Sequence, residues 1–84
     1  MNNSVWTLYL LQCSDDTLYT GVTNDLERRL EEHNSSKLGA KYTRGRRPVK
    51  LIYSSKMASR SAALQEEYRI KQLPRKEKLK LAQS

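Results

Sequence analysis

The fold of this chain is decided by its N-terminal stretch from Val5 to Val22, which reads VWTLYLLQCSDDTLYTGV. Two runs rich in β-branched, aromatic and leucine side chains, residues 5–13 and 17–22, flank three polar residues that favour a turn. This pattern predicts a β-hairpin with a three-residue loop. The last loop position of such a turn favours left-handed backbone geometry, which Asp16 tolerates less well than glycine.

The loop length determines which residues of the hairpin face each other. A three-residue loop sets Leu11 opposite Tyr19 and Tyr9 opposite Gly21. Because alternate residues of a strand share a face, Tyr9 and Tyr19 are expected on the same side of the sheet. The glycine leaves a gap that the two phenols flank.

Downstream of the hairpin, the pattern changes to helices, a basic loop and one more strand. The expected elements are a helix from Asp25 capped by Thr23 or Asn24, a basic loop with a short helical turn ending at Pro48, a strand at residues 49–55, a helix from Ser59 or Ser61 to Leu73, and another short helix within residues 75–83.

The first helix has an inward and an outward side. Leu26, Leu30 and His33 fall on one narrow stripe, with Arg29 at its edge. Arg28 lies on the solvent side with acidic residues around it, and a glutamate four positions later can pair with it. The two adjacent arginines are therefore expected to differ: Arg29 looks toward whatever the buried face packs against.

The 84 residues allow one small domain, residues 1–84, with a basic C-terminal segment at about 75–84. Sixteen Lys and Arg residues against nine Asp and Glu residues give a net charge of +7. Residues 35–59 hold seven basic side chains and no acidic one. A solvated face is the alternative interpretation, but a block without internal ion-pair partners favours a polyanion, and nucleic acid is the leading partner class.

Other classes of protein fit the sequence less well. A membrane surface ranks well below nucleic acid, because the basic block contains two glycines and a proline and no strongly amphipathic helix. No apolar run is long enough to span a membrane, and residues 1–4 lack the basic region and the small-residue cleavage site of a secretory signal, so we expect neither export nor membrane spanning. One cysteine, Cys13, and one histidine, His33, cannot build a structural zinc site. We expect a cytoplasmic protein in which Cys13 and Trp6 pack in the core.

Two adjacent glutamates, Glu66 and Glu67, lie within or beside the apolar stripe of the long C-terminal helix. A carboxylate near a buried face needs a cation, a hydrogen-bond donor or a metal. Periodicity does not choose between the two residues. An ion pair with Arg29 or another basic residue is the simpler interpretation.

Five pieces of the sequence, in order and spacing, resemble the GIY-YIG nuclease superfamily. They are TLY at residues 7–9, YTG at 19–21, NDLERRL at 24–30, EHN at 32–34 and ALQEEYRIK at 63–71. The match spans nearly the whole chain and is most similar to small stand-alone bacterial members, and more distantly to the incision domain of the bacterial excinuclease. Gly-Ile before the first tyrosine is replaced by Thr7-Leu8, and the isoleucine of the second motif by Thr20.

The resemblance implies an α+β fold, a small three-stranded antiparallel sheet flanked by helices in the order β-β-α-α-β-α. It also implies an endonuclease that hydrolyses DNA phosphodiester bonds in DNA repair or recombination with a single Mg²⁺ or Mn²⁺. The catalytic residues that it assigns are Tyr9, Tyr19, Arg29, His33 and Glu67, and it chooses Glu67 over Glu66 as the metal ligand.

Phosphodiester hydrolysis gives each of these residues a role. Glu67 would hold the cation and Arg29 would bind the nonbridging oxygens. Tyr9 would act as general base or water positioner, provided that Arg29 and the metal lower its pKa, and Tyr19 would hydrogen-bond the phosphate or the nucleophile. His33 would be a phosphate ligand or a proton carrier. The tyrosines as ordinary sheet residues and His33 as a core-edge residue are the structural alternatives.

Basic and aromatic residues outside this site are expected to hold the nucleic acid. They are Lys37, Lys41, Tyr42, Arg44, Arg46, Arg47, Lys71, Arg75 and Lys76. DNA is the expected partner, with RNA also open. Two alternative functions stay open: a non-catalytic nucleic-acid-binding module, and a nuclease subunit that depends on a protein partner for target specificity.

Overall fold

The computed structural model describes residues 5–35 and 38–83, so Lys37 of the expected nucleic-acid surface lies outside the described residues. The elements follow in the order β1 (Trp6–Gln12), β2 (Leu18–Thr23), α1 (Leu26–Ser35), α2 (Lys41–Arg44), β3 (Lys50–Met57), α3 (Arg60–Lys71) and α4 (Arg75–Ala82). The α+β fold is as predicted, with α4 formed by the basic C-terminal segment.

The three strands form one antiparallel sheet in the order β2-β1-β3. The predicted hairpin register is confirmed, because Leu11 pairs with Tyr19 and Tyr9 pairs with Gly21. Asp16 takes the left-handed conformation that the three-residue loop requires, with a φ of 67°. β3 has an irregularity opposite Leu10 and Leu11, where Ile52 is the extra residue.

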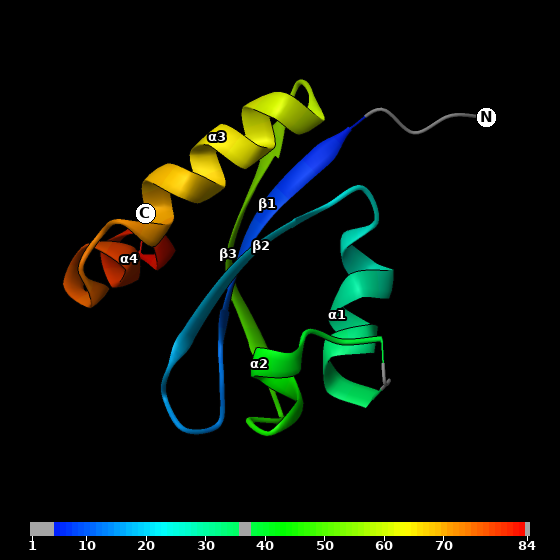
Figure 1. Cartoon of the computed structure of the whole chain (residues 1–84). Coiled ribbons are helices and arrows are strands. Elements are labelled where there is room, and N and C mark those ends of the chain that lie inside the picture. The colour runs from blue at the N-terminus through cyan, green and yellow to red at the C-terminus, as the bar shows by residue number, and fades with distance from the viewer. Residues whose placement is uncertain (1–4, 36–37, 84) are drawn as a thin grey trace.

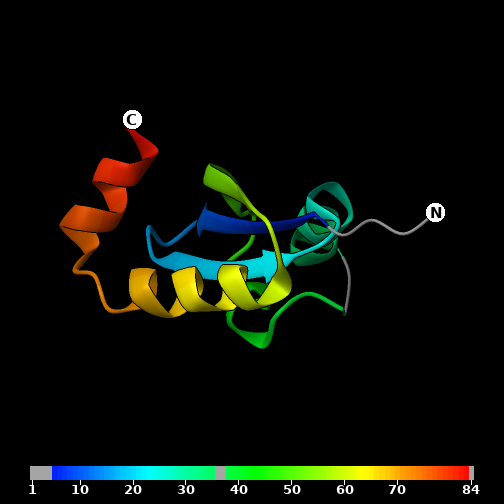
Figure 2. The ribbon, with the colours of Figure 1, turned by 90° about the horizontal axis from the view of Figure 1, so that it is seen from above.

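Helices cover both faces of the sheet. In Figure 1, α3 lies on one side of the strands, and α1 and α2 lie on the other. Leu8 and Leu10 are fully buried on the α3 side, to which the helix contributes Ala63 and Ile70. The view from above in Figure 2 shows α4 beyond the C-terminal end of α3, turned away from the axis of that helix.

The opposite face of the sheet carries the core that supports the site. Tyr9, Leu11, Cys13 and Val49 are buried together there. The partly buried residues packed against them are Tyr19, Leu26, Leu30 and Leu51. The predicted stripe of α1 therefore faces this core, and Cys13 packs in it as expected, with burial raising the pKa of its thiol.

Several details differ from the sequence prediction. Asp25, not Thr23 or Asn24, caps α1, because its Oδ1 accepts a hydrogen bond from the Arg28 N–H, while Thr23 Oγ1 accepts one from the Asp25 N–H. α3 ends at Lys71 instead of Leu73. The prediction that Trp6 belongs to the core is wrong: Trp6 is half-buried, with the Arg60 guanidinium 5.6 Å from its ring centroid.

Ser59 is the residue that caps α3, where its side chain accepts a hydrogen bond from the Ala62 N–H. None of the helices among residues 5–35 and 38–83 has the length and apolar character needed to cross a membrane.

Candidate active site

The two strands of the hairpin bring Tyr9 to the centre of the site. Tyr9 is 2% exposed and lies across Gly21 of β2. A Cβ at position 21 would lie 2.5 Å from the Tyr9 hydroxyl oxygen, closer than real side-chain contacts allow. The gap predicted from the glycine is therefore filled by the phenol ring itself, and the close approach requires that residue 21 has no side chain.

His33 reaches Tyr9 from α1. The Tyr9 hydroxyl and His33 Nε2 are 2.8 Å apart, and the imidazole is fully buried. The Tyr19 ring lies 5.3 Å from the His33 ring and 6.4 Å from the Tyr9 ring, between centroids. Three of the five predicted site residues thus form one aromatic cluster on the α1 side of the sheet.

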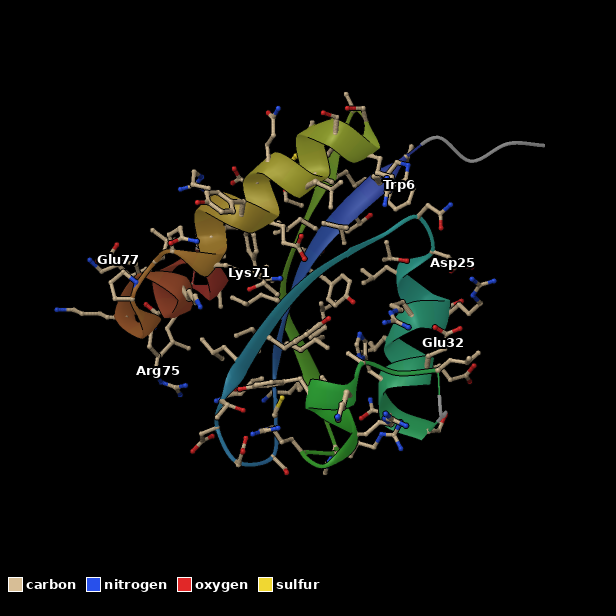
Figure 3. The ribbon with its side chains drawn as sticks, viewed as in Figure 1. Trp6, Asp25, Glu32, Lys71, Arg75 and Glu77 are labelled. Atoms are coloured by element: carbon tan, nitrogen blue, oxygen red, sulfur yellow. The ribbon has the colours of Figure 1, made fainter. Side chains whose placement is uncertain are left out.

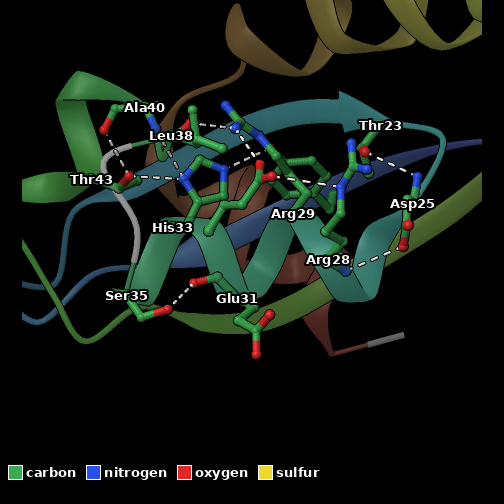
Figure 4. Close-up of polar contacts among 12 residues, drawn as sticks. Thr23, Asp25, Arg28, Arg29, Glu31, His33, Ser35, Leu38, Ala40 and Thr43 are labelled. Atoms are coloured by element: carbon green, nitrogen blue, oxygen red, sulfur yellow. Dashed lines mark hydrogen bonds and ion pairs between the residues drawn. The ribbon is translucent and has the colours of Figure 1, made fainter.

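The other nitrogen of His33 is held by α2 and the loop before it (Figure 4). Nδ1 lies 2.8 Å from Thr43 Oγ1, and the Ala40 N–H is 3.5 Å away from the same nitrogen. Thr43 is itself fully buried, and its hydroxyl is 3.0 Å from the Ala40 carbonyl oxygen. Both ring nitrogens are therefore engaged inside the protein, which argues against the hypothesis that His33 binds phosphate directly.

Arg29 lies at the edge of the cluster, as its place on the helix predicts. Its Nη1 donates to Glu32 Oε1 at 2.9 Å and to the Leu38 carbonyl at 2.7 Å (Figure 4). Arg28 also reaches Glu32, at 3.6 Å, and confirms the predicted pair four residues apart. The Arg29 side chain is 28% exposed, so its guanidinium borders both the cluster and solvent.

Burial sets the protonation states of Tyr9 and His33. Burial raises the pKa of Tyr9 to about 12, against the lowering effect of the Arg29 guanidinium. Burial and the Arg29 charge lower the pKa of His33 to about 4. At neutral pH the pair is therefore a neutral phenol beside a neutral imidazole. The pKa of Tyr9 is shifted in the direction opposite to the one a general base needs.

The adjacent glutamates of α3 have different surroundings. Glu66 accepts two hydrogen bonds from Arg69, from Nε at 2.9 Å and from Nη2 at 2.5 Å, which lowers the pKa of its carboxyl group. Glu67 forms an ion pair with Lys71 Nζ at 3.3 Å, and its side chain is 19% exposed. Both glutamates have the basic partner expected of a carboxylate beside a buried face, but neither partner is Arg29.

Glu67 is electrostatically linked to the cluster although it belongs to a different helix. Its negative charge is one of the causes that raise the pKa of Tyr9. Among residues 5–35 and 38–83 there is no group of three His, Cys, Asp or Glu side chains placed to hold a metal ion. A single carboxylate nevertheless fits Mg²⁺, which binds one or two carboxylates and completes its shell with waters and phosphate oxygens.

The partner of Glu67 in its ion pair, Lys71, is an exposed side chain. The Lys71 side chain is 51% exposed, and an ion pair with one exposed partner contributes little stability, so Lys71 can exchange for another positive charge. Figure 3 shows Lys71 near the C-terminal end of α3, away from Glu32 on α1. The helix that carries Glu67, α3, lies on the opposite side of the strands from α1 (Figure 1).

A second aromatic contact extends the cluster toward the surface. Tyr42 of α2 stacks on Tyr19, with ring centroids 5.8 Å apart and an angle of 29° between the planes. Arg46 lies over the Tyr42 ring at 4.1 Å and donates to Asp15 Oδ2 in the hairpin loop at 3.0 Å. This arrangement ties Tyr19 to the basic block.

The predicted nucleic-acid-binding residues fall into two groups. Arg46 and Arg47 support the fold: Arg47 Nε donates to the His33 carbonyl at 2.6 Å and Nη2 to the Glu32 carbonyl at 3.2 Å, at the C-terminal end of α1. Arg75 donates to the Asp16 carbonyl and ties α4 to the hairpin loop. The exposed members are Lys41, Tyr42, Arg44, Lys71, Arg75 and Lys76.

Sequence reasoning missed two residues that support the site. Thr43 holds His33, and Asn34 joins the end of α1 to Val49, the residue before β3, by donating to the Val49 carbonyl at 3.1 Å and accepting from the Val49 N–H at 2.7 Å. Asn34 follows His33 directly within the EHN piece, and this position could have indicated that Asn34 supports the site. Thr43 lies in the basic block, where no hydrophobic periodicity in the sequence marks it.

The sequence matches the GIY-YIG catalytic domain over residues 5–80. A UPF0213 protein from Oceanobacillus iheyensis is 61% identical over 74 residues, which cover 88% of this chain and 85% of that protein. A UPF0213 protein from Halobacterium salinarum is 54% identical over 71 residues, which cover 84% and 91% of the two chains.

Two solution NMR structures resemble the chain in sequence and in fold. One, of a UPF0213 protein from Bacillus halodurans, has 40% sequence identity and a TM-score of 0.59, with 94% of this chain and 83% of that chain covered. The other, of a protein from E. faecalis, has 46% identity and a TM-score of 0.64, with 92% and 81% covered.

Proposed function

Because the chain belongs to the GIY-YIG family, we propose that it is a metal-dependent endonuclease that hydrolyses DNA phosphodiester bonds. The observation that carries this proposal is the buried hydrogen bond between Tyr9 and His33 beside the Arg29 guanidinium. It combines a proton donor, a proton acceptor and a fixed positive charge at one place. These are the groups needed to activate water and to neutralise the charge that develops on a phosphate.

Arg29 binds the scissile phosphate in this mechanism. Its Nη1 is occupied by Glu32 and Leu38, which hold the guanidinium plane in place. The planar group has five N–H donors in total, so others remain for the nonbridging phosphate oxygens. Tyr19, half-buried between His33 and Tyr42, directs its hydroxyl to the phosphate or to the attacking water.

Tyr9 and His33 move the proton. A phenol with a pKa near 12 cannot be the base by ionising first, because almost none of it is phenolate at neutral pH. Tyr9 instead accepts a proton from the attacking water while its own proton passes to His33 Nε2. The Arg29 charge that lowers the pKa of His33 is offset when a phosphate anion binds there, so substrate binding itself makes His33 a better acceptor.

Glu67 supplies the ligand for a divalent cation. Bound there, Mg²⁺ or Mn²⁺ would stabilise negative charge on the phosphate and on the leaving 3′ oxygen. Lys71 gives up its ion pair with Glu67 and is then available to the DNA backbone. Exposed cations of α2 and α4, namely Lys41, Arg44 and Lys76, extend the positive surface on either side.

Cleavage of plasmid, single-stranded and branched DNA with Mg²⁺, Mn²⁺ or EDTA tests the proposal. We expect metal-dependent nicking that is lost in Glu67→Ala and retained in Glu66→Ala, a matched control one position away whose carboxylate is held by Arg69. Thermal unfolding of both variants verifies that they fold. Binding of every substrate without cleavage by the wild type would refute the enzyme and favour a nucleic-acid-binding module or a partner-dependent subunit. Equal activity of the two variants would refute Glu67 as the metal ligand.

A further inference from the structure

The buried end of the cluster raises a question that the proposed nuclease activity leaves open: which nitrogen of His33 carries the proton. A neutral imidazole has one N–H and one acceptor nitrogen. If Nε2 is the acceptor, Tyr9 donates to it; if Nε2 carries the proton, Tyr9 can only accept. The two tautomers therefore give the Tyr9 hydroxyl opposite roles, and only the first lets its proton leave toward His33.

The hydrogen-bond donors around His33 favour one of the two tautomers. With the proton on Nδ1, that nitrogen donates to Thr43 Oγ1 at 2.8 Å, the Thr43 hydroxyl donates to the Ala40 carbonyl at 3.0 Å, and Tyr9 donates to Nε2 at 2.8 Å. Each of these three donors then has an acceptor, and only the Ala40 N–H, which points at Nδ1 from 3.5 Å, loses its acceptor among these contacts. With the proton on Nε2, the phenol oxygen would accept from both Arg29 and His33, and its own proton would have no acceptor among these contacts.

We propose that Thr43 is a positioning residue that holds His33 in the Nδ1–H tautomer, so that Nε2 receives the Tyr9 proton. The relay runs from Tyr9 through His33 and Thr43 to the Ala40 carbonyl, which accepts but cannot donate. α2 has only four residues, Lys41–Arg44, and the Ala40 carbonyl also accepts the Thr43 and Arg44 N–H groups. The end of the relay is therefore held by the first turn of this helix. The catalytic role of the tautomer rests on the proposed nuclease activity; the tautomer itself does not.

Other groups around His33 do not compete with Thr43 for Nδ1. Arg29 and Glu32 of α1 and Arg47 of the loop before β3 act on the ring through their charges, and Tyr19 of β2 contacts it edge-on. The exception is the Ala40 N–H, which points at Nδ1 from 3.5 Å. It is a weak contact in the native network, but it becomes the available donor to Nδ1 once the Thr43 hydroxyl is removed, and it then favours the opposite tautomer.

The test uses the fact that His33 is the only histidine of the chain, so imidazole ¹⁵N resonances belong to it without ambiguity. Long-range ¹H–¹⁵N spectra at pH 7 should show a protonated Nδ1 and an unprotonated Nε2 in the wild type. Thr43→Ser keeps the hydroxyl and should preserve this pattern. Thr43→Val has nearly the same shape without the hydroxyl, and should move the proton to Nε2.

Cleavage kinetics then connect the tautomer to activity. Thr43→Val should lower kcat on the order of tenfold to a hundredfold with KM little changed, and Thr43→Ser should restore it. An Nε2–H signal in the wild type, or an unchanged Nδ1–H signal in a folded Thr43→Val protein, would overturn the proposal whether or not the protein cuts DNA. A wild type with the Nδ1–H tautomer but no cleavage would refute the nuclease and leave the role of Thr43 in setting the tautomer intact.

Discussion

The Tyr9 hydroxyl lies 2.8 Å from His33 Nε2, although 24 positions separate the two residues in the chain and both are buried. The contact needs two independent features of the sequence. Tyr9 crosses the neighbouring strand where Gly21 has no side chain, and His33 lies on the inward stripe of α1. Because the partners come from different elements, the contact exists only in the folded protein.

Gly21→Ala should disturb this contact directly. A Cβ would meet the Tyr9 hydroxyl at 2.5 Å and its ring at 2.6 Å, so the buried phenol must shift. We expect a loss of about 1–3 kcal/mol in the free energy of unfolding, measured by urea denaturation, together with a loss of cleavage. Gly45→Ala is the matched control, since nothing lies within 4 Å of a Cβ there. Equal stability of the two variants would contradict the tight packing of Tyr9 on Gly21.

The hairpin and its pairing could be predicted because strand periodicity acts over short distances. A spacing of two positions, from Tyr9 to Leu11 and from Tyr19 to Gly21, is enough to set which side chains share a face. The inward stripe of α1 follows from helical periodicity in the same way. These rules placed Tyr9, Tyr19 and His33 on surfaces that meet.

The contacts that Thr43, Arg47 and Asp25 make could not be predicted, because these residues lie in short or irregular segments where no periodicity applies. Arg47, which is predicted to bind nucleic acid, also donates to the His33 and Glu32 carbonyls near the end of α1. No pattern in the sequence indicated that Thr43 would contact His33. The choice of Asp25 over its neighbours as helix cap depends on backbone geometry at the end of β2, which composition does not specify.

The stability of the protein should depend on pH through His33. The unfolded histidine has a pKa of about 6.5, and the folded one has a pKa of about 4. Between these values the unfolded chain binds more protons than the folded one. The contribution of His33 to the free energy of unfolding is therefore fully present above pH 6.5, and it falls as the pH drops, by up to about 3 kcal/mol in total. Urea unfolding at a series of pH values measures the slope. His33→Gln should remove the pH dependence of the free energy of unfolding between pH 5 and 6.5. A slope unchanged by that substitution would contradict burial of a neutral imidazole.

Substitution of Arg44 should affect DNA binding and substitution of Arg47 should affect stability, although only two residues separate them. Arg44 is exposed on α2, so Arg44→Ala should weaken duplex binding and reduce its salt dependence by about one phosphate contact. With about six basic residues in contact, the wild-type slope of log affinity against log salt should be on the order of −5. Arg47→Ala should instead destabilise the fold by about 1.5–3 kcal/mol, because it removes two hydrogen bonds to the end of α1. Binding titrations at several salt concentrations and urea unfolding separate the two effects, and identical behaviour of the variants would contradict this division.

Tyr42 should act through its ring and not through its hydroxyl. Its ring stacks on Tyr19 and lies under Arg46, which Asp15 holds from the hairpin loop. Tyr42→Phe keeps both contacts and should cleave DNA at the wild-type rate. Tyr42→Leu removes them, so the Tyr19 ring loses its outer support, and kcat should fall by about tenfold, with duplex affinity reduced less. Single-turnover cleavage together with binding titrations distinguishes this outcome from a role for Tyr42 in holding the DNA, which would instead lower affinity and leave the rate at saturation unchanged.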